Sequence, residues 1–162
     1  MIKQLIKYEM TDNRHHHHHH CRQIRRLFDG LLGGYIESEE NLDQAGSCFV
    51  FGEAVVSGDA LVYDDAWVFG NARVYGDALV SGDAQVRGHA QVSGNARVYG
   101  DARVHGNAQV SGNARVSGNA LVSGSAQVYG DALVYDDAWV FGNARVYGDA
   151  LVCGGAKVSG DA

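Results

Sequence analysis

The feature that most constrains this chain is a six-residue repeat that runs unbroken from residue 48 to residue 162. Valine returns at every sixth position from Val50 to Val158, nineteen times in a row. Alanine does the same from Ala54 to Ala162, and a glycine followed by Asp or Asn closes almost every unit. One unit therefore has the form Ala-x-Val-y-Gly-Asp/Asn.

Each unit combines a short strand with a corner. Ala and Val alternate with x, so they point to one face of the strand and x points to the other. The y-Gly-Asp/Asn segment tolerates the left-handed backbone of a sharp turn, and Asp64 and Asp136 take the place of its glycine twice. The repeat predicts a coil whose rungs pair with the rungs above and below, with Ala and Val inside.

The energetics predict that the units are stable only as an array. Ordering six residues costs about 6–12 kcal/mol at about 1–2 kcal/mol per residue. Burying one valine returns about 1.5–3 kcal/mol, and alanine returns less. One unit therefore cannot fold alone, and each must gain stability from its neighbours, as in other solenoids.

The repeat resembles the hexapeptide-repeat family of left-handed parallel β-helices. That family places a small residue four positions after an aliphatic one, as Val50 with Ala54 and Val56 with Ala60 do here. The resemblance covers residues 48–162. It implies an all-β fold, a single-stranded left-handed parallel β-helix with three six-residue units per coil, wound against the usual right-handed preference.

Residues 1–46 do not repeat, and we expect them to form a small β-rich cap on a solenoid of residues 47–162. Residues 2–10 and 22–28 are predicted strands, Asp29-Gly30 is a predicted tight turn, and residues 38–42 are a predicted helical turn. A cap is needed because the end of a solenoid exposes a strand edge and its core.

Part of this cap carries a second resemblance. Residues 24–27 (Ile-Arg-Arg-Leu) and 32–42 (Leu-Gly-Gly-Tyr-Ile-Glu-Ser-Glu-Glu-Asn-Leu) are similar to the N-terminal segment of phage and prophage hexapeptide-repeat proteins described as transferase-like. The resemblance implies a phage-related protein that is associated with a phage particle. With no secretory or membrane-spanning segment in the sequence, the alternative expectation is a cytoplasmic location.

A run of six histidines interrupts the cap. We interpret the run as an affinity tag that replaces the loop between the first two strands. It would bind nickel or zinc, but it predicts no native metal site. Its members are His15, His16, His17, His18, His19 and His20.

Composition excludes several partners. The net charge of −6 is dispersed, so the basic surface that neutralises nucleic-acid phosphates is missing. No apolar run approaches the roughly 18 residues that span a bilayer. The three cysteines Cys21, Cys48 and Cys153 form no disulfide framework; we expect Cys48 to be a small buried group, because it occupies an alanine slot.

Candidate catalytic residues are few. Many hexapeptide-repeat proteins are acyltransferases with a histidine base, but outside the tag only His89 and His105 remain, both in corner slots. A γ-class carbonic anhydrase needs three histidine ligands for its zinc. We therefore predict no catalytic residue and no cofactor, and we interpret both histidines as exposed corner substitutions.

The outward x positions carry more information. With three units per coil, one outer column, the leucine face, holds Leu61, Leu79, Arg97, Arg115, Leu133 and Leu151. A second column, the tryptophan face, holds Trp67, Gln85, Arg103, Leu121, Trp139 and Lys157. Large exposed apolar rows mark interfaces, although stacking within a column explains them equally well.

Three hypotheses follow. The first is a structural scaffold that self-associates, through the leucine face or through an open C-terminal end, with Trp67 and Trp139 as further interface candidates. The second is a glycan-binding surface on the tryptophans and the tyrosine columns. The third is an acyltransferase-like enzyme, which rests on family analogy alone. Residues 60–80 recur unchanged as 132–152, which keeps every column in phase across four coils.

Overall fold

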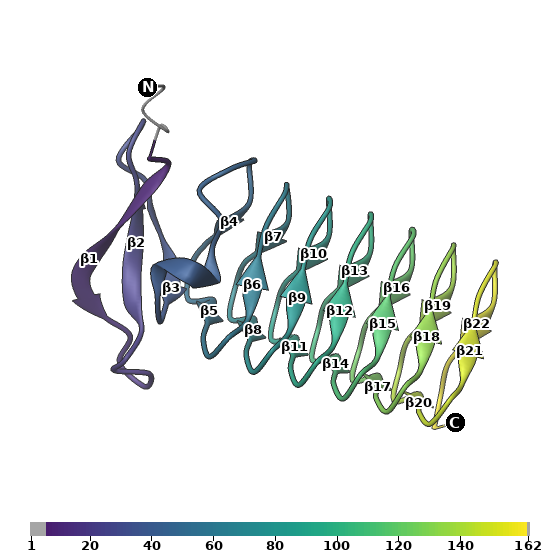
Figure 1. Ribbon diagram of the computed structural model, residues 1–162. Coiled ribbons are helices and arrows are strands. Elements are labelled where there is room, and N and C mark those ends of the chain that lie inside the picture. Colours follow the sequence, from purple (N-terminus) through teal and green to yellow (C-terminus); the bar gives the residue numbers. More distant parts are fainter. Residues whose placement is uncertain (1–5, 162) are drawn as a thin grey trace.

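The computed structural model describes residues 6–161, and these residues form a parallel β-solenoid with an antiparallel hairpin at its N-terminal end (Figure 1). The strands form three sheets, and the coils stack one after another along the length of the molecule. A single turn of 3-10 helix, η1 (Glu39–Asn41), is the helical element of the described residues. The prediction of an all-β parallel solenoid is confirmed.

Each sheet is one face of the solenoid, and its repeat strands are separated by one full coil of three units. The cap hairpin joins the first sheet, which contains β1 (Tyr8–Arg14), β2 (Arg22–Arg26), β3 (Leu32–Ile36), β5 (Val55–Val56), β8 (Arg73–Val74), β11 (Gln91–Val92), β14 (Gln109–Val110), β17 (Gln127–Val128) and β20 (Arg145–Val146). The tryptophan face contains β4 (Phe49–Val50), β7 (Trp67–Val68), β10 (Gln85–Val86), β13 (Arg103–Val104), β16 (Leu121–Val122), β19 (Trp139–Val140) and β22 (Lys157–Val158). The leucine face contains β6 (Leu61–Val62), β9 (Leu79–Val80), β12 (Arg97–Val98), β15 (Arg115–Val116), β18 (Leu133–Val134) and β21 (Leu151–Val152).

Backbone hydrogen bonds between successive coils hold this register. In most units the x residue, the y residue and the corner residue donate their amides to carbonyls of the next coil. On one coil, Trp67 donates to Ala84, Phe69 to Val86 and Asn71 to Gly88, at 2.9, 2.9 and 2.8 Å. Strands of only two residues are stable because they belong to ladders that run the length of the solenoid.

The interior is a narrow column of valine and alanine. The valines from Val50 to Val140 are fully buried, and Val152 is still only 8% exposed. Val158, in the last coil, is partly buried and packs against the same core. The valines therefore point inward, as the repeat predicts. Cys48 and Cys21 are also fully buried, and the expectation for Cys48 is confirmed.

The corners explain the Gly-Asp/Asn pairs. The corner glycines have positive φ, and Asp64 and Asp136 adopt the same conformation with φ of 56° and 57°. Each of these aspartates accepts a hydrogen bond from the amide of the glycine one coil further on. Side chains in the next position form ladders between successive coils, such as Asn113 to Asp131 at 2.9 Å. Turn chemistry thus accounts for these columns without a bound cation.

The cap is a hairpin that continues the first sheet. β1 and β2 pair antiparallel, β2 pairs antiparallel with β3, and β3 then pairs in parallel with β5. The strand expected at residues 2–10 instead begins at Tyr8 and extends to Arg14, while residues 2–5 lie outside the described part. The turn at residues 29–30 and the helical turn are where the sequence predicts them.

The first coil begins inside the segment assigned to the cap. Ile36 pairs with Val56 and Leu42 bridges to Val62, so both already stack on the repeats. The partners in these pairs are further apart in sequence than those of the regular coils, because the segment between Leu42 and Phe49 is longer than a regular unit. The non-repeating segment thus supplies the first rung as well as the hairpin above it.

Tyr8 closes the interior at this end. Its side chain is 1% exposed, and its hydroxyl donates to the carbonyls of Leu42 and Glu39 at 2.7 and 2.9 Å. Lys7 extends alongside and donates its ammonium to the Cys48 carbonyl at 2.9 Å. These bonds satisfy carbonyls that have no coil above them, which is the task expected of a cap.

The buried column gives a direct prediction. Val104→Asp would place an unpaired carboxylate in the apolar interior, so the free energy of unfolding should fall by about 3 kcal/mol or more. Gln109→Asp, at an outward position of the next unit, should be nearly neutral. Thermal unfolding followed by circular dichroism compares the two variants. Equal melting temperatures would contradict the inward orientation.

Candidate functional site

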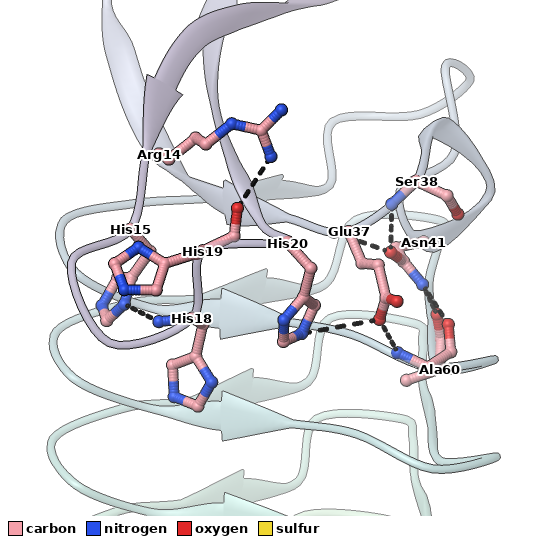
Figure 2. A network of polar contacts seen from close by, with 10 residues as sticks. Arg14, His15, His18, His19, His20, Glu37, Ser38, Asn41 and Ala60 are labelled. Carbon is pink, nitrogen blue, oxygen red and sulfur yellow. Dashed lines mark hydrogen bonds and ion pairs between the residues drawn. The ribbon is translucent and has the colours of Figure 1, made fainter.

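Two parts of the surface carry the side chains that could bind a ligand or act chemically. The first is the junction where the histidine loop between β1 and β2 meets the first coils, shown in Figure 2. The second comprises the outer columns of the leucine and tryptophan faces.

The histidine loop is folded onto the solenoid. His15 is only 5% exposed and packs edge-on against the ring of Tyr35, with ring centroids 4.8 Å apart. Its Nδ1 accepts hydrogen bonds from the amides of His17 and His18 at 3.2 and 3.1 Å. Burial lowers the pKa of His15, and the neighbouring imidazoles of His16 and His18 lower it further. His15 is therefore neutral at pH 7 and stabilises the loop as a hydrogen-bond acceptor.

A possible metal-ligand set lies beside this histidine. One ligand atom each from His15, His16 and Glu53 lie within 4.8 Å of one another. However, Nδ1 of His15 already accepts two amides, so the neutral ring carries its proton on Nε2, the nitrogen that faces Glu53 at 3.9 Å. A metal at Nε2 would require that proton to leave and the loop to rearrange. The loop as folded is therefore not a preformed zinc site.

Glu37 links the other end of the loop to the second coil. Its Oε2 accepts a hydrogen bond from the amide of Gly58 at 2.7 Å and lies 3.9 Å from Nε2 of His20 (Figure 2). Arg14 donates to the carbonyl of His19 at 2.7 Å on the opposite side of the loop. These contacts position the loop but create no cleft.

Asn41 is the most constrained polar side chain of the junction. It is 1% exposed, and its Oδ1 accepts hydrogen bonds from the amides of Glu37 and Ser38 at 3.1 and 2.8 Å. Its Nδ2 donates to the carbonyls of Gly58 and Ala60 at 2.8 and 2.9 Å (Figure 2). The amide thus satisfies carbonyls of the second coil that would otherwise face an incomplete rung. Its role is structural, and no sequence pattern marks it.

The two candidate histidines occupy different surroundings. His89 is exposed and borders a surface cavity of about 360 Å³ together with His15, His16, His17 and Glu53. His105 is half-buried, and both this burial and the charges of Arg87 and Arg103 lower its pKa. Among residues 6–161, no side chain forms a hydrogen bond with either imidazole, so no group orients them as a catalytic base would be oriented.

The outer columns follow the spacing of one coil. On the leucine face, Leu61 pairs with Leu79, Arg97 with Arg115, and Leu133 with Leu151. Three of the four leucines are half-buried by their column neighbours, whereas Leu151 is 58% exposed. Stacking within the column therefore accounts for most of this face.

The tryptophan face is more exposed. Trp67 and Trp139 are each 44% exposed. The ring of Trp67 packs against Phe51, with centroids 5.6 Å apart, and the ammonium of Lys157 lies 4.8 Å from the Trp139 ring centroid. The two tryptophans occupy equivalent places in the repeat, four coils apart. They are the largest apolar side chains that the outer columns leave accessible.

The regular coils match a known family of repeats. The family model described as YdcK Beta solenoid repeat matches residues 72–88, 90–106, 108–124, 126–142 and 138–154. No curated protein matches the chain. No helix within residues 6–161 has the length and apolar character required to cross a membrane. The resemblance to phage proteins stays a prediction.

The junction yields a prediction about stability. Asn41→Ala would remove the donor from the carbonyl of Gly58 and from the buried carbonyl of Ala60, at about 1–3 kcal/mol for an unsatisfied buried group. The variant should therefore unfold at lower denaturant concentration than the parent chain. Asn107→Ala, at an exposed corner, is the matched control and should change little. Equal loss in both variants, or loss in neither, would contradict the role assigned to Asn41.

Proposed function

Since the chain carries the YdcK-type beta solenoid repeat over residues 72–154, we propose that this β-solenoid protein is a structural scaffold and not an enzyme. The observation that carries the proposal is the unbroken interior, in which valine and alanine stay buried from coil to coil. No loop interrupts residues 48–161 to form a cleft over the coils. A surface of regular columns suits the display or joining of other molecules.

We further propose that the scaffold self-associates through the tryptophan face. Trp67 and Trp139 support this choice because each leaves nearly half of a large aromatic surface exposed. Aromatic residues of this kind are enriched at the centres of protein interfaces. The leucine face is the second candidate, because three of its four leucines are half-buried within their column.

We also propose that the chain is related to the left-handed hexapeptide-repeat β-helices. The strand at every sixth residue, with three strands in each coil, supports the relation to hexapeptide-repeat proteins. We infer the left-handed winding of that family for this chain. A crystal structure with right-handed coils would contradict this inference.

Light scattering tests the self-association. The intact chain at tens of micromolar should be oligomeric, and Trp67→Lys/Trp139→Lys should reduce it to a monomer. Gln109→Lys/Gln127→Lys, on the first sheet, is the control and should stay oligomeric. A monomeric intact chain would refute self-association. If the oligomer persists in the tryptophan variant but is lost in Leu61→Lys/Leu151→Lys, the interface lies on the leucine face.

The enzymatic alternative is tested separately. Acyl transfer by a hexapeptide-repeat enzyme requires that the chain bind an acyl donor such as acetyl-CoA. Because no loop of residues 48–161 forms a cleft over the coils, titration calorimetry with acetyl-CoA should show no saturable heat. Saturable binding that His105→Ala abolishes would instead support an acyltransferase.

A further inference from the structure

A corner of the leucine face carries a regular row of tyrosines. The y positions that follow its strands alternate between a large ring and a small hydroxyl, in the order Tyr63, Ser81, Tyr99, Ser117 and Tyr135. Successive rungs of a sheet are about 4.8 Å apart, so the tyrosines recur about every 9.6 Å. Each serine leaves a gap between two rings.

These gaps are surface cavities of similar composition. One, of about 330 Å³, lies between Tyr99 and Tyr135 and is lined by Arg115, Ser117 and Leu133. Another, of about 230 Å³, lies between Tyr63 and Tyr99 and is lined by Leu79, Ser81, Arg97 and Arg115. Both are therefore lined by two tyrosines two coils apart, by the serine between them in the column, and by leucine and arginine. Because they share Tyr99 and Arg115, they form one groove with two subsites.

The two arginines and the central tyrosine of the groove are not engaged in ion pairs or side-chain hydrogen bonds of the fold. Arg97 and Arg115 stack on adjacent coils, and within residues 6–161 neither has a carboxylate at ion-pair distance. Directly opposed like charges are unfavourable in a sheet, so the pair is not explained as a source of stability. The side chain of Tyr99 is 41% exposed, and its hydroxyl forms no hydrogen bond with another described residue.

The combination of groups identifies the class of ligand. A flat aromatic ring packs against the apolar face of a molecule, while arginine supplies only donors and serine supplies both a donor and acceptors. Asp136 also lines the larger subsite, and although its Oδ2 accepts the amide of Gly154, its Oδ1 is a further acceptor. A sugar ring has one apolar face and a rim of hydroxyls that both donate and accept. The aspartates of this corner and the net charge of −6 oppose a strongly acidic ligand.

We propose that this groove binds an extended, uncharged polysaccharide along the axis of the solenoid. Sugars stack on the tyrosines, and hydroxyls between them accept hydrogen bonds from Arg97 and Arg115. The two-coil spacing of the rings is close to the length of two linked sugars in an extended chain, so successive tyrosines contact alternate sugars. The groove lies at a corner of the leucine face, so the tryptophan face stays free for self-association. Glycan binding is a function beyond the proposed scaffold.

Tyr99 is the residue whose change tests the groove, because it belongs to both subsites. The same column already contains serine at positions 81 and 117, so the Tyr99→Ser variant should fold. Tyr75→Ser is the matched control: Tyr75 is 40% exposed and lies at a different corner, in a column that also contains Ser57 and Ser93. Circular dichroism establishes that both variants keep the parent fold.

The experiment is a glycan array followed by calorimetry with cellohexaose as an uncharged probe and oligogalacturonate as an acidic one. The intact chain should bind uncharged chains of four or more sugars and bind disaccharides far more weakly. Tyr99→Ser should weaken binding about tenfold or more, equivalent to about 1.4 kcal/mol, and Tyr75→Ser should leave it unchanged. Failure of the intact chain to bind any uncharged glycan would overturn the proposal. Equal loss in both variants, unchanged binding in Tyr99→Ser, or binding of acidic glycans alone would also overturn it.

Discussion

The backbone hydrogen bonds between successive coils are the constraint on which the rest of this structure depends. Each coil donates amides to carbonyls of the next coil, as Arg73 does to Ala90 and Tyr75 to Val92. The ladder fixes a coil at three repeat units, so each position stacks on positions of the same kind. A single residue inserted within a strand would turn its inward side chains outward, whereas extra residues at a corner leave the columns in register, as between Leu42 and Phe49. This explains why valine and alanine keep their places along the whole repeat.

The same constraint decides where function can reside. The interior of the regular coils is filled by valine and alanine, because three strands with tight corners enclose little space. Chemistry must therefore come from the outer columns and from the non-repeating junction. The junction's polar side chains, such as Asn41 and Tyr8, are engaged in completing the first coil. The columns remain, and they present the same kinds of side chain at fixed intervals, which suits partners that are themselves extended or repeated.

The repeat made much of this predictable from sequence. The strict spacing of Val50 and Ala54 indicates which side chains face inward, and the coil of three units places Leu61 beside Leu79, as the structure shows. The junction was less predictable because its contacts occur once. No pattern reveals that Asn41 bridges two carbonyls, that β1 extends to Arg14, or that the first coil is longer than the others. The loop histidines, interpreted as a tag, fold against Tyr35 because Nδ1 of His15 accepts two amides, a contact that no repeat encodes.

The most direct test of the three-unit coil is to measure how far apart in sequence two residues are when they lie next to each other on adjacent coils. With Cys153 changed to serine, Ser93→Cys/Ser111→Cys places two thiols one coil apart, at about the 4.8 Å spacing of adjacent rungs and within the range of a disulfide. Ser93→Cys/Ser117→Cys places them at different corners. Mild oxidation followed by mass spectrometry of proteolytic peptides should show the 93–111 disulfide and no intramolecular 93–117 disulfide. The reverse result would contradict a coil of three repeat units.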